Sequence, residues 1–223
     1  MSINKSIILQ TRTILSLVFI FILSSCNNAE HERKEIHRVW DSYQQSLSLK
    51  MGSESIKYID SASLNFYTYM LGVIRTADSN KVESLPVYQK ILVLGIRQMG
   101  STAYIRSMDG RSLFAYCVQT GLLGSAVDEK SGFRIKNILG NTAYAEMVDS
   151  SGKAGLDLQL HKENGQWKVN LTTVYAKYAD ETWKIFIKQS GKTEREFIDT
   201  ILDYLCGEKP RERTRAEIWH PVN

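Results

Sequence analysis

Apolar residues recur at helical spacing through the first half of the chain. One stripe precedes Lys50 and predicts an amphipathic helix that ends before Gly52. Its members are Ile36, Trp40, Tyr43 and Leu47. The further predicted helices are a short one at Glu54–Ile59, one on the stripe Leu64, Tyr67, Leu71 and Ile74, one at Val87–Met99, and one at Arg111–Thr120. The last segment also alternates as a strand would, but Asp109 before it and Gly121 after it favour a helix.

The pattern changes to alternation after Gly132. Four segments rich in alternating or β-branched residues follow, and turn sequences separate them: Phe133–Leu139, Thr142–Val148, Gly155–Lys162 and Gln166–Tyr175. In the third segment Leu156, Leu158 and Leu160 share one face. Between the last two segments, Asn164-Gly165 is typical of a two-residue hairpin turn. We therefore predict an antiparallel meander with one buried face.

Helical spacing returns at the end of the chain. Trp183 and Phe186 mark one helix that ends near Gly191. Thr193 and Glu196 then form a capping box at the start of another helix. The stripe of that helix is Ile198, Ile201, Leu202 and Leu205. Helices, a four-stranded sheet and further helices in this order predict the α+β class.

Composition and charge change this picture little. The chain has 223 residues, of which 43% are hydrophobic and 23% charged, as in an ordinary soluble globular domain. Its formal net charge is +4, and the basic residues near the C-terminus alternate with Glu208, Glu212 and Glu217. A nucleic-acid-binding protein needs a clustered basic face. We therefore predict no nucleic-acid partner.

The N-terminal segment has the order of a secretory signal. Lys5 and Arg12 precede the apolar segment Ile14–Leu23, which is shorter than the roughly 20 residues of a membrane-spanning helix. The segment ends in Leu23-Ser24-Ser25-Cys26, which resembles the lipobox of bacterial lipoproteins. This resemblance implies that residues 1–25 are a signal peptide and that the Cys26 thiol carries a lipid, such as diacylglyceryl, with palmitate among the attached fatty acids.

The lipobox also implies a place for the protein. Residues 26–34 would be the lipid anchor and a polar tether, so that the membrane is a partner through the lipid. Asn27 follows the cysteine, where an aspartate is associated with inner-membrane retention in some Gram-negative bacteria. The expectation is therefore the cell envelope of a Gram-negative bacterium, at the outer rather than the inner membrane.

The last predicted hairpin resembles that of nuclear-transport-factor-2-like (NTF2-like, SnoaL-like) domains. The residues concerned run from Leu156 to Val169 and combine an alternating strand, the Asn-Gly turn and the entry Trp167-Lys168-Val169. The resemblance implies a cone-shaped, cystatin-like fold over residues 35–175, with helices packed on a curved four-stranded sheet. Residues 176–223 would be a C-terminal helical extension and tail, which such domains usually lack.

A cone of this kind would enclose a pocket, and several polar and aromatic residues are candidates to line it. The candidates are Tyr67, Tyr144, Glu146 and Trp167, and Tyr58, Asp60 and Tyr69 are further acids or hydroxyls in the same class. No acid–base constellation of the enzymes with this fold can be matched residue by residue, so no catalytic residue is predicted. The alternative for Tyr144 and Glu146 is a core tyrosine and a solvated edge carboxylate.

The cysteines and histidines leave little room for metal or thiol chemistry. Cys117 and Cys206 either form one disulfide or are two separately buried thiols. His37, His161 and His220 are far apart and have no second ligand at a usual spacing, so we expect surface histidines. No metal and no other cofactor is predicted.

Together these features predict a lipid-anchored envelope protein that binds a small ligand or a partner protein without catalysis. Two alternatives stay open. The first is a small enzyme of the isomerase or hydratase kind that works inside the cone. The second is an interaction module, such as a toxin-neutralising or envelope-assembly protein. A homodimer is also left open.

Overall fold

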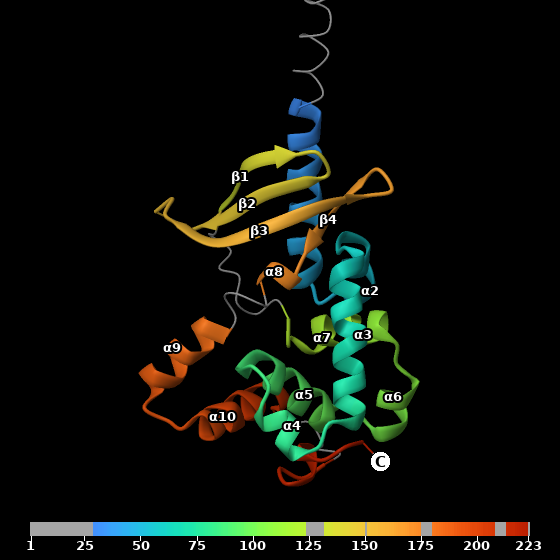
Figure 1. Ribbon diagram of the computed structural model, residues 1–223, viewed down its shortest axis with the longest axis vertical. Coiled ribbons are helices and arrows are strands. Elements are labelled where there is room, and N and C mark those ends of the chain that lie inside the picture. Colours follow the sequence, from blue (N-terminus) through green and yellow to red (C-terminus); the bar gives the residue numbers. More distant parts are fainter. Residues whose placement is uncertain (1–28, 124–131, 150, 175–179, 208–212, 223) are drawn as a thin grey trace, which may run out of the picture. The chain divides into compact units, whose positions relative to one another are not determined.

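A computed structural model describes residues 29–123, 132–149, 151–174, 180–207 and 213–222 (Figure 1). The chain divides into two compact units, Met1–Arg38 and Val39–Asn223. Residues 29–48 are helical, which confirms the first predicted helix. Within its part in the second unit, the side chains of Trp40, Tyr43 and Leu47 are buried as the stripe predicts. The architecture below is that of the second unit.

Helices fill the segment between this first helix and the sheet. They are α2 (Gly52–Ser55), the 3-10 turn η1 (Ile56–Tyr58), α3 (Ser61–Thr76), α4 (Ser79–Glu83), α5 (Val87–Met99), α6 (Thr102–Ser107) and α7 (Gly110–Thr120). The helices predicted around Leu71, at Val87–Met99 and at Arg111–Thr120 are confirmed. Helices α4 and α6 were not predicted, because five or six residues are too few to show a helical period.

The segment Arg111–Thr120, which could have been a helix or a strand, is part of helix α7. Both ends of this helix have the residues that commonly start and end helices. The Asp109 side chain accepts a hydrogen bond from Ser112 N, and Gly121 ends the helix at a φ of 82°. Its first residue, Gly110, lies against α3, where a Cβ would come within 2.1 Å of Thr68 Oγ1. A glycine is therefore required for the two helices to pack this closely.

The predicted antiparallel meander is confirmed. Its strands are β1 (Gly132–Leu139), β2 (Thr142–Val148), β3 (Ala154–Glu163) and β4 (Gln166–Asn170), hydrogen-bonded in the order β1-β2-β3-β4. Asn164 and Gly165 join β3 to β4 with φ values of 49° and 79°, as the hairpin prediction requires.

The fourth strand is shorter than predicted. It ends at Asn170 instead of reaching Tyr175, and helix α8 (Thr172–Val174) follows. The reason is local, because Asn170 Oδ1 accepts hydrogen bonds from Thr173 N at 3.1 Å and Thr172 Oγ1 at 2.7 Å. This side chain turns the backbone away from the strand direction.

The sheet buries one face, as the alternation predicts. The side chains of that face are apolar and almost inaccessible to water: Ala143, Ala145, Leu158, Leu160, Trp167 and Val169. At the edge strand β1, the Phe133 ring stacks on Trp40 with 4.9 Å between ring centroids. The opposite face carries the polar residues of β2 and β3 and is the more open to solvent.

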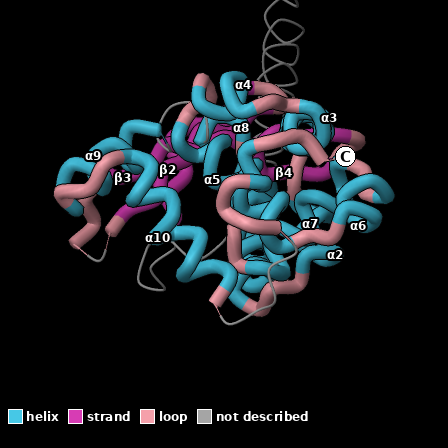
Figure 2. The backbone as a smooth tube through the Cα atoms, turned by 90° about the horizontal axis from the view of Figure 1, so that it is seen from below, coloured by secondary structure: helices cyan, strands magenta, loops and turns pink. Residues whose placement is uncertain are grey.

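The C-terminal part returns to helix as predicted. Helix α9 (Asp180–Ser190) precedes α10 (Glu194–Cys206), and the 3-10 turn η3 (Glu217–Trp219) follows. The predicted capping box is present, with Thr193 Oγ1 accepting from Glu196 N and the Glu196 carboxylate accepting from Thr193 N. Helix α10 packs against α5, and Figure 2 shows the two helices next to each other. The confirmed class is thus a mixed α+β fold with a four-stranded antiparallel sheet.

A buried arginine joins the helical layer to the C-terminal segment. The Arg97 side chain is fully buried and donates to the carbonyl oxygens of Ile74, Ala77 and Ile218 at 2.6–3.0 Å. Burial lowers the pKa of Arg97 to about 10, so the guanidinium stays charged at neutral pH. The guanidinium N–H groups satisfy carbonyl oxygens at the C-terminal end of α3, where the helix dipole favours a positive charge.

Candidate functional site

The predicted site residues lie in different parts of the molecule. Cys26 lies outside the described residues. Tyr67 is fully buried in α3, where its ring meets Phe114 edge-to-face at 5.2 Å between centroids. Trp167 is on the buried face of the sheet, whereas Tyr144 lies on the opposite face with 38% of its surface exposed. The sheet itself therefore separates Trp167 from Tyr144.

Glu146 belongs to a network of ion pairs on the open sheet face. Its carboxylate lies 2.5 Å from Arg134 Nη2 and 3.0 Å from Lys136 Nζ. Lys136 also reaches Asp157 on β3 at 2.7 Å. Hydrogen bonds from Arg134, and then from Lys136, lower the pKa of Glu146. The two basic side chains cover this carboxylate. Glu146 thus links β2 to β1, and Lys136 links β1 to β3 through Asp157.

Cys117 and Cys206 are both buried and form no disulfide with each other in the part of the chain that is described. The structure therefore matches the alternative of two separately buried thiols. Burial raises the pKa of the Cys117 thiol, because the thiolate would lose its hydration. A thiol in that state is a poor nucleophile.

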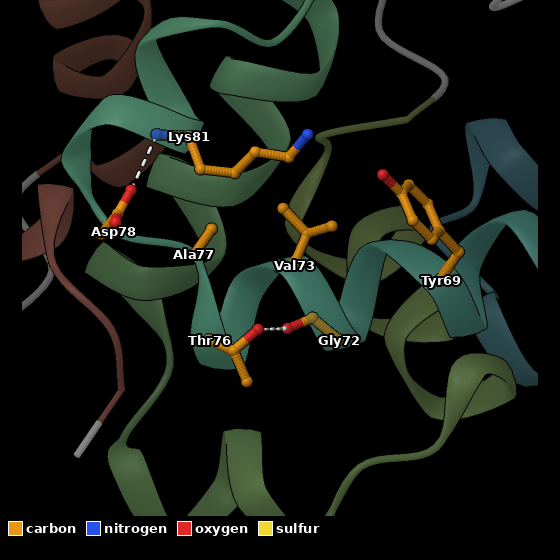
Figure 3. A pocket seen from close by; sticks show the side chains of 7 residues that line it. All are labelled: Tyr69, Gly72, Val73, Thr76, Ala77, Asp78 and Lys81. Carbon is orange, nitrogen blue, oxygen red and sulfur yellow. Dashed lines mark hydrogen bonds between the residues drawn. The ribbon is translucent and has the colours of Figure 1, made fainter.

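One open groove of about 410 Å³ lies between α3 and α4 (Figure 3). The residues that line it are Tyr69, Gly72, Val73, Thr76, Ala77, Asp78 and Lys81. The carboxylate in this groove, Asp78, caps the start of α4, because its Oδ1 accepts a hydrogen bond from Lys81 N at 2.8 Å. The groove contains Tyr69 from the wider set of candidates but none of the four predicted pocket residues.

The most concentrated polar cluster lies where α3 begins beside β4. Ile59 forms a parallel bridge with Val169, and Asp60 N donates to Val169 O at 3.1 Å. These bonds place the Asp60 side chain against β3 and β4. Asp60 is fully buried, and Asn170 is 2% exposed. A buried carboxylate needs several hydrogen-bond donors, and this one has them.

Each carboxylate oxygen of Asp60 has two hydrogen-bond partners. Oδ1 accepts from Ser63 N at 2.8 Å and from Ser63 Oγ at 2.5 Å, which caps α3. Oδ2 accepts from Asn170 Nδ2 at 2.5 Å and lies 2.9 Å from His161 Nδ1. Ser63 Oγ in turn accepts from Leu171 N at 2.8 Å, so the cluster ties α3 to the residues that follow β4.

His161 is the one member of this cluster that reaches water. About a third of its side chain (33%) is exposed, whereas that of Asp60 is inaccessible. His161 lies on β3 opposite Lys168 of β4 and Thr142 of β2, on the more open face of the sheet. The arrangement holds an imidazole in a fixed position by a buried carboxylate, which is a geometry suited to proton transfer or ligand binding.

Sequence reasoning found only part of this cluster. Asp60 was among the wider candidates. His161 is partly exposed, as expected of a surface histidine, but its contact with Asp60 was not predicted. The two residues are 101 positions apart. The sequence does show Asp60 and Ser63 at cap spacing, but nothing in it points from this cap to His161.

Comparisons of the chain with protein families, with curated proteins and with solved structures found no match. In the described residues, no helix is both long and apolar enough to cross a membrane. No group of three or more histidine, cysteine or acidic side chains in those same residues is arranged to hold a metal ion.

Proposed function

We propose that this chain is a lipid-anchored protein of the bacterial cell envelope whose folded domain binds a small ligand or a partner protein. The observation that carries the proposal is the sequence Leu23-Ser24-Ser25-Cys26 after a basic and apolar segment. Lipid on Cys26 would hold the domain at a membrane surface without a spanning helix, since two or more acyl chains together give stable anchoring.

The proposed fold of this domain is the NTF2-like cone. Its support is the order of elements, with helices before an antiparallel meander, and the Asn164-Gly165 hairpin that leads into Trp167. In such a cone the ligand would lie between the sheet and the helices. The polar face that carries Tyr144 is on the other side of the sheet, outside this space, and its partly exposed Tyr144 ring and its ion pairs offer hydrogen bonds and charges to a protein partner.

The anchor is tested by metabolic labelling with an alkyne fatty acid in a Gram-negative host. Wild-type protein should be labelled and recovered in the membrane fraction, and its intact mass should show the loss of residues 1–25. Cys26→Ser should abolish both the label and the membrane recovery. Cys206→Ser is the matched control and should keep both, because Cys206 is buried in the folded domain. An unlabelled wild-type protein would overturn the anchor.

A second experiment tests whether the protein is anchored in the outer or the inner membrane. Asn27 follows the proposed lipidated cysteine. Wild-type protein should sediment with the outer membrane in a density gradient, and Asn27→Asp should move it toward the inner membrane. Equal distribution of both variants would remove the argument for the outer membrane.

A small enzyme is the second candidate function, and one observation favours it. Asp60 and His161 form a hydrogen-bonded pair at 2.9 Å whose histidine reaches solvent. An isomerase or hydratase needs such an acid–base group. The interaction-module alternative calls for an apolar patch on the open sheet face. That face instead carries the pairs of Arg134, Lys136, Glu146 and Asp157.

Binding is tested on native protein extracted from membranes in detergent. Mass spectrometry of the purified sample should find a small molecule or a protein in stoichiometric amount, and the same preparation shows whether the protein is a homodimer. A sample that contains this chain alone, in repeated preparations from its own envelope, would count against binding. Turnover of a metabolite in an activity screen would favour the enzyme instead.

A further inference from the structure

The hydrogen bonds around Asp60 fix the position of each proton in the cluster. Thr173 N can only donate, so its partner on Asn170 must be Oδ1, and Nδ2 must face Asp60. Ser63 Oγ accepts from Leu171 N, so its own hydrogen points to Asp60 Oδ1. Together with Ser63 N, these give three donors to this carboxyl group besides His161, as expected for the ionised form, which only accepts.

The same hydrogen bonds determine the tautomer of His161. Since the Asp60 carboxylate accepts, Nδ1 of His161 must carry the hydrogen of their 2.9 Å contact. Asn170 Nδ2 also lies 3.5 Å from Nδ1, but both atoms then carry hydrogens, so this is proximity and not a bond. The neutral ring keeps its lone pair on Nε2.

Nε2 is the atom through which His161 can act. Among the described residues, no hydrogen bond reaches it, and a third of the side chain is exposed. The buried partner leaves the ring little freedom to turn, because Asp60 is itself fixed by Ser63 and Asn170. A lone pair held in one direction at the protein surface is the requirement for a general base.

We propose that Asp60 and His161 form a proton-transfer pair that acts on water or on the O–H group of a small polar molecule. His161 Nε2 uses its lone pair to form an N–H bond, and the O–H bond breaks with its electron pair left on oxygen. The oxygen then attacks the carbonyl carbon of an ester, and the bond from that carbon to the leaving oxygen breaks with its electron pair on the leaving oxygen. The proton passes from Nε2 to that oxygen or to solvent. The Asp60 carboxylate stays ionised and stabilises the positive ring.

The roles of the two residues are distinct. His161 is the proton-transfer residue, and Asp60 is a positioning residue that sets the tautomer and direction of the ring. The proposal goes beyond ligand binding and does not depend on the lipid anchor, because its atoms all lie between residues 60 and 173. Loss of lipid from Cys26 would leave it intact, so the two proposals fail separately.

The first test reads the tautomer directly. Full-length protein labelled with nitrogen-15 at histidine is examined by NMR in detergent, with His161→Gln to assign the signal. At a pH where the ring is neutral, His161 should show a protonated Nδ1 and an unprotonated Nε2. The opposite tautomer, or a ring that exchanges freely between both, would overturn the proposal.

The second test measures the rate at which the protein hydrolyses 4-nitrophenyl acetate, which reports whether the lone pair of His161 Nε2 is reactive. His161→Gln should lower the hydrolysis rate at least about tenfold, since general-base catalysis contributes roughly 100-fold or more. His220→Gln is the matched control and should change the rate less than about twofold, because His220 is exposed outside the cluster. Equal rates for wild type and His161→Gln would refute the proposal.

The third test separates positioning from simple stability. Asp60→Asn should lower the probe rate about tenfold, shift its pH profile and mix the tautomers of His161. Asp109→Asn, at the exposed cap of α7 outside the cluster, is the matched control and should keep the rate within about twofold. Native-like circular dichroism is required of both variants. If Asp60→Asn does not fold, the wild-type tautomer and His161→Gln still decide. A folded Asp60→Asn with an unchanged rate and pH profile would remove Asp60 from the pair.

Discussion

Two helix caps in this molecule have the same local design and different surroundings. Asp60 caps α3 through Ser63 N at 2.8 Å and Ser63 Oγ at 2.5 Å. Asp109 caps α7 through Ser112 N and Ser112 Oγ, both at 2.7 Å. Both follow the pattern Asp-x-x-Ser at the start of a helix. Asp109 is exposed, and Asp60 is fully buried.

The difference lies in the second carboxylate oxygen. In Asp60, Oδ2 binds Asn170 and His161 from the sheet, at sequence separations of 110 and 101 residues. The hydrogen bonds that cap α7 both go to Oδ1 of Asp109 and both come from Ser112, three residues further along the chain. In α7 the Asp-x-x-Ser motif only caps the helix. In α3 the same motif also connects the helix to the sheet and orients the imidazole ring of His161.

The largest expected difference between the two caps is in stability. Asp60→Ala removes the cap and leaves buried donors of Ser63, Asn170 and His161 without an acceptor, so we expect a loss of about 3 kcal/mol. Asp109→Ala removes only an exposed cap and should cost about 1 kcal/mol. Urea denaturation of each variant measures the loss. Equal losses would mean that the sheet contacts of Asp60 contribute nothing.

A smaller effect is expected when a sheet partner of Asp60 is removed. Asn170→Ala deletes the donor to Oδ2 and the acceptor for Thr173 N, and should cost about 2 kcal/mol of unfolding free energy. Asn80→Ala, an exposed position in α4, is the control and should be within about 0.5 kcal/mol of wild type. Urea denaturation again gives the result, and a cost as small as that of the control would contradict the view that Asn170 holds the cluster.

The serines allow a finer comparison. Ser63 Oγ donates to Asp60 and accepts from Leu171 N, whereas Ser112 Oγ donates to Asp109 in an exposed cap. Ser63→Ala should therefore cost about 1.5 kcal/mol, and Ser112→Ala about 0.5 kcal/mol. Thermal unfolding followed by circular dichroism resolves the two. A larger loss for Ser112→Ala would reverse the comparison.

The smallest expected effect is the pH dependence of the exposed cap. Hydrogen bonds from the Ser112 hydroxyl, and then from Ser112 N, lower the pKa of Asp109 below its usual 3.8. The unfolded chain then takes up the proton first as the pH falls, so the contribution of Asp109 to stability is present above the unfolded pKa and is lost as the pH falls through the lower folded pKa.

Thermal unfolding of wild type and Asp109→Asn from about pH 6 to about pH 2.5 checks this direction. The wild type should lose stability relative to the variant as acid is added. A difference that stays constant over this range would show that the charge of Asp109 has no part in the cap.

Local signals in the sequence predicted local structure well. The Asp109 cap and Gly121 identified α7 correctly, Thr193 and Glu196 marked the start of α10, and Asn164-Gly165 gave the turn between β3 and β4. In each of these cases the residues that decide the conformation lie within a few positions of one another, so their hydrogen bonds can be inferred from spacing alone.

The errors came from side chains whose partners depend on the tertiary fold or on a competing local bond. The fourth strand was predicted too long because Asn170 captures Thr173 N and ends it. Asp60 was a candidate acid, but its partnership with His161 spans 101 residues and has no periodic pattern. Neither secondary-structure propensity nor residue spacing can predict a contact between Asp60 and His161. It becomes visible only when the sheet and α3 are packed together.

The bridge between Ile59 and Val169 sets an order of events during synthesis. A ribosome that has completed α3 must still add everything from α4 to the end of β4 before the residues that bind Asp60 Oδ2 exist. Closing so long a loop carries an entropic cost that the nascent α3 cannot recover by itself. A chain cut before Asn170 would therefore leave the Asp60 carboxylate without one of its donors.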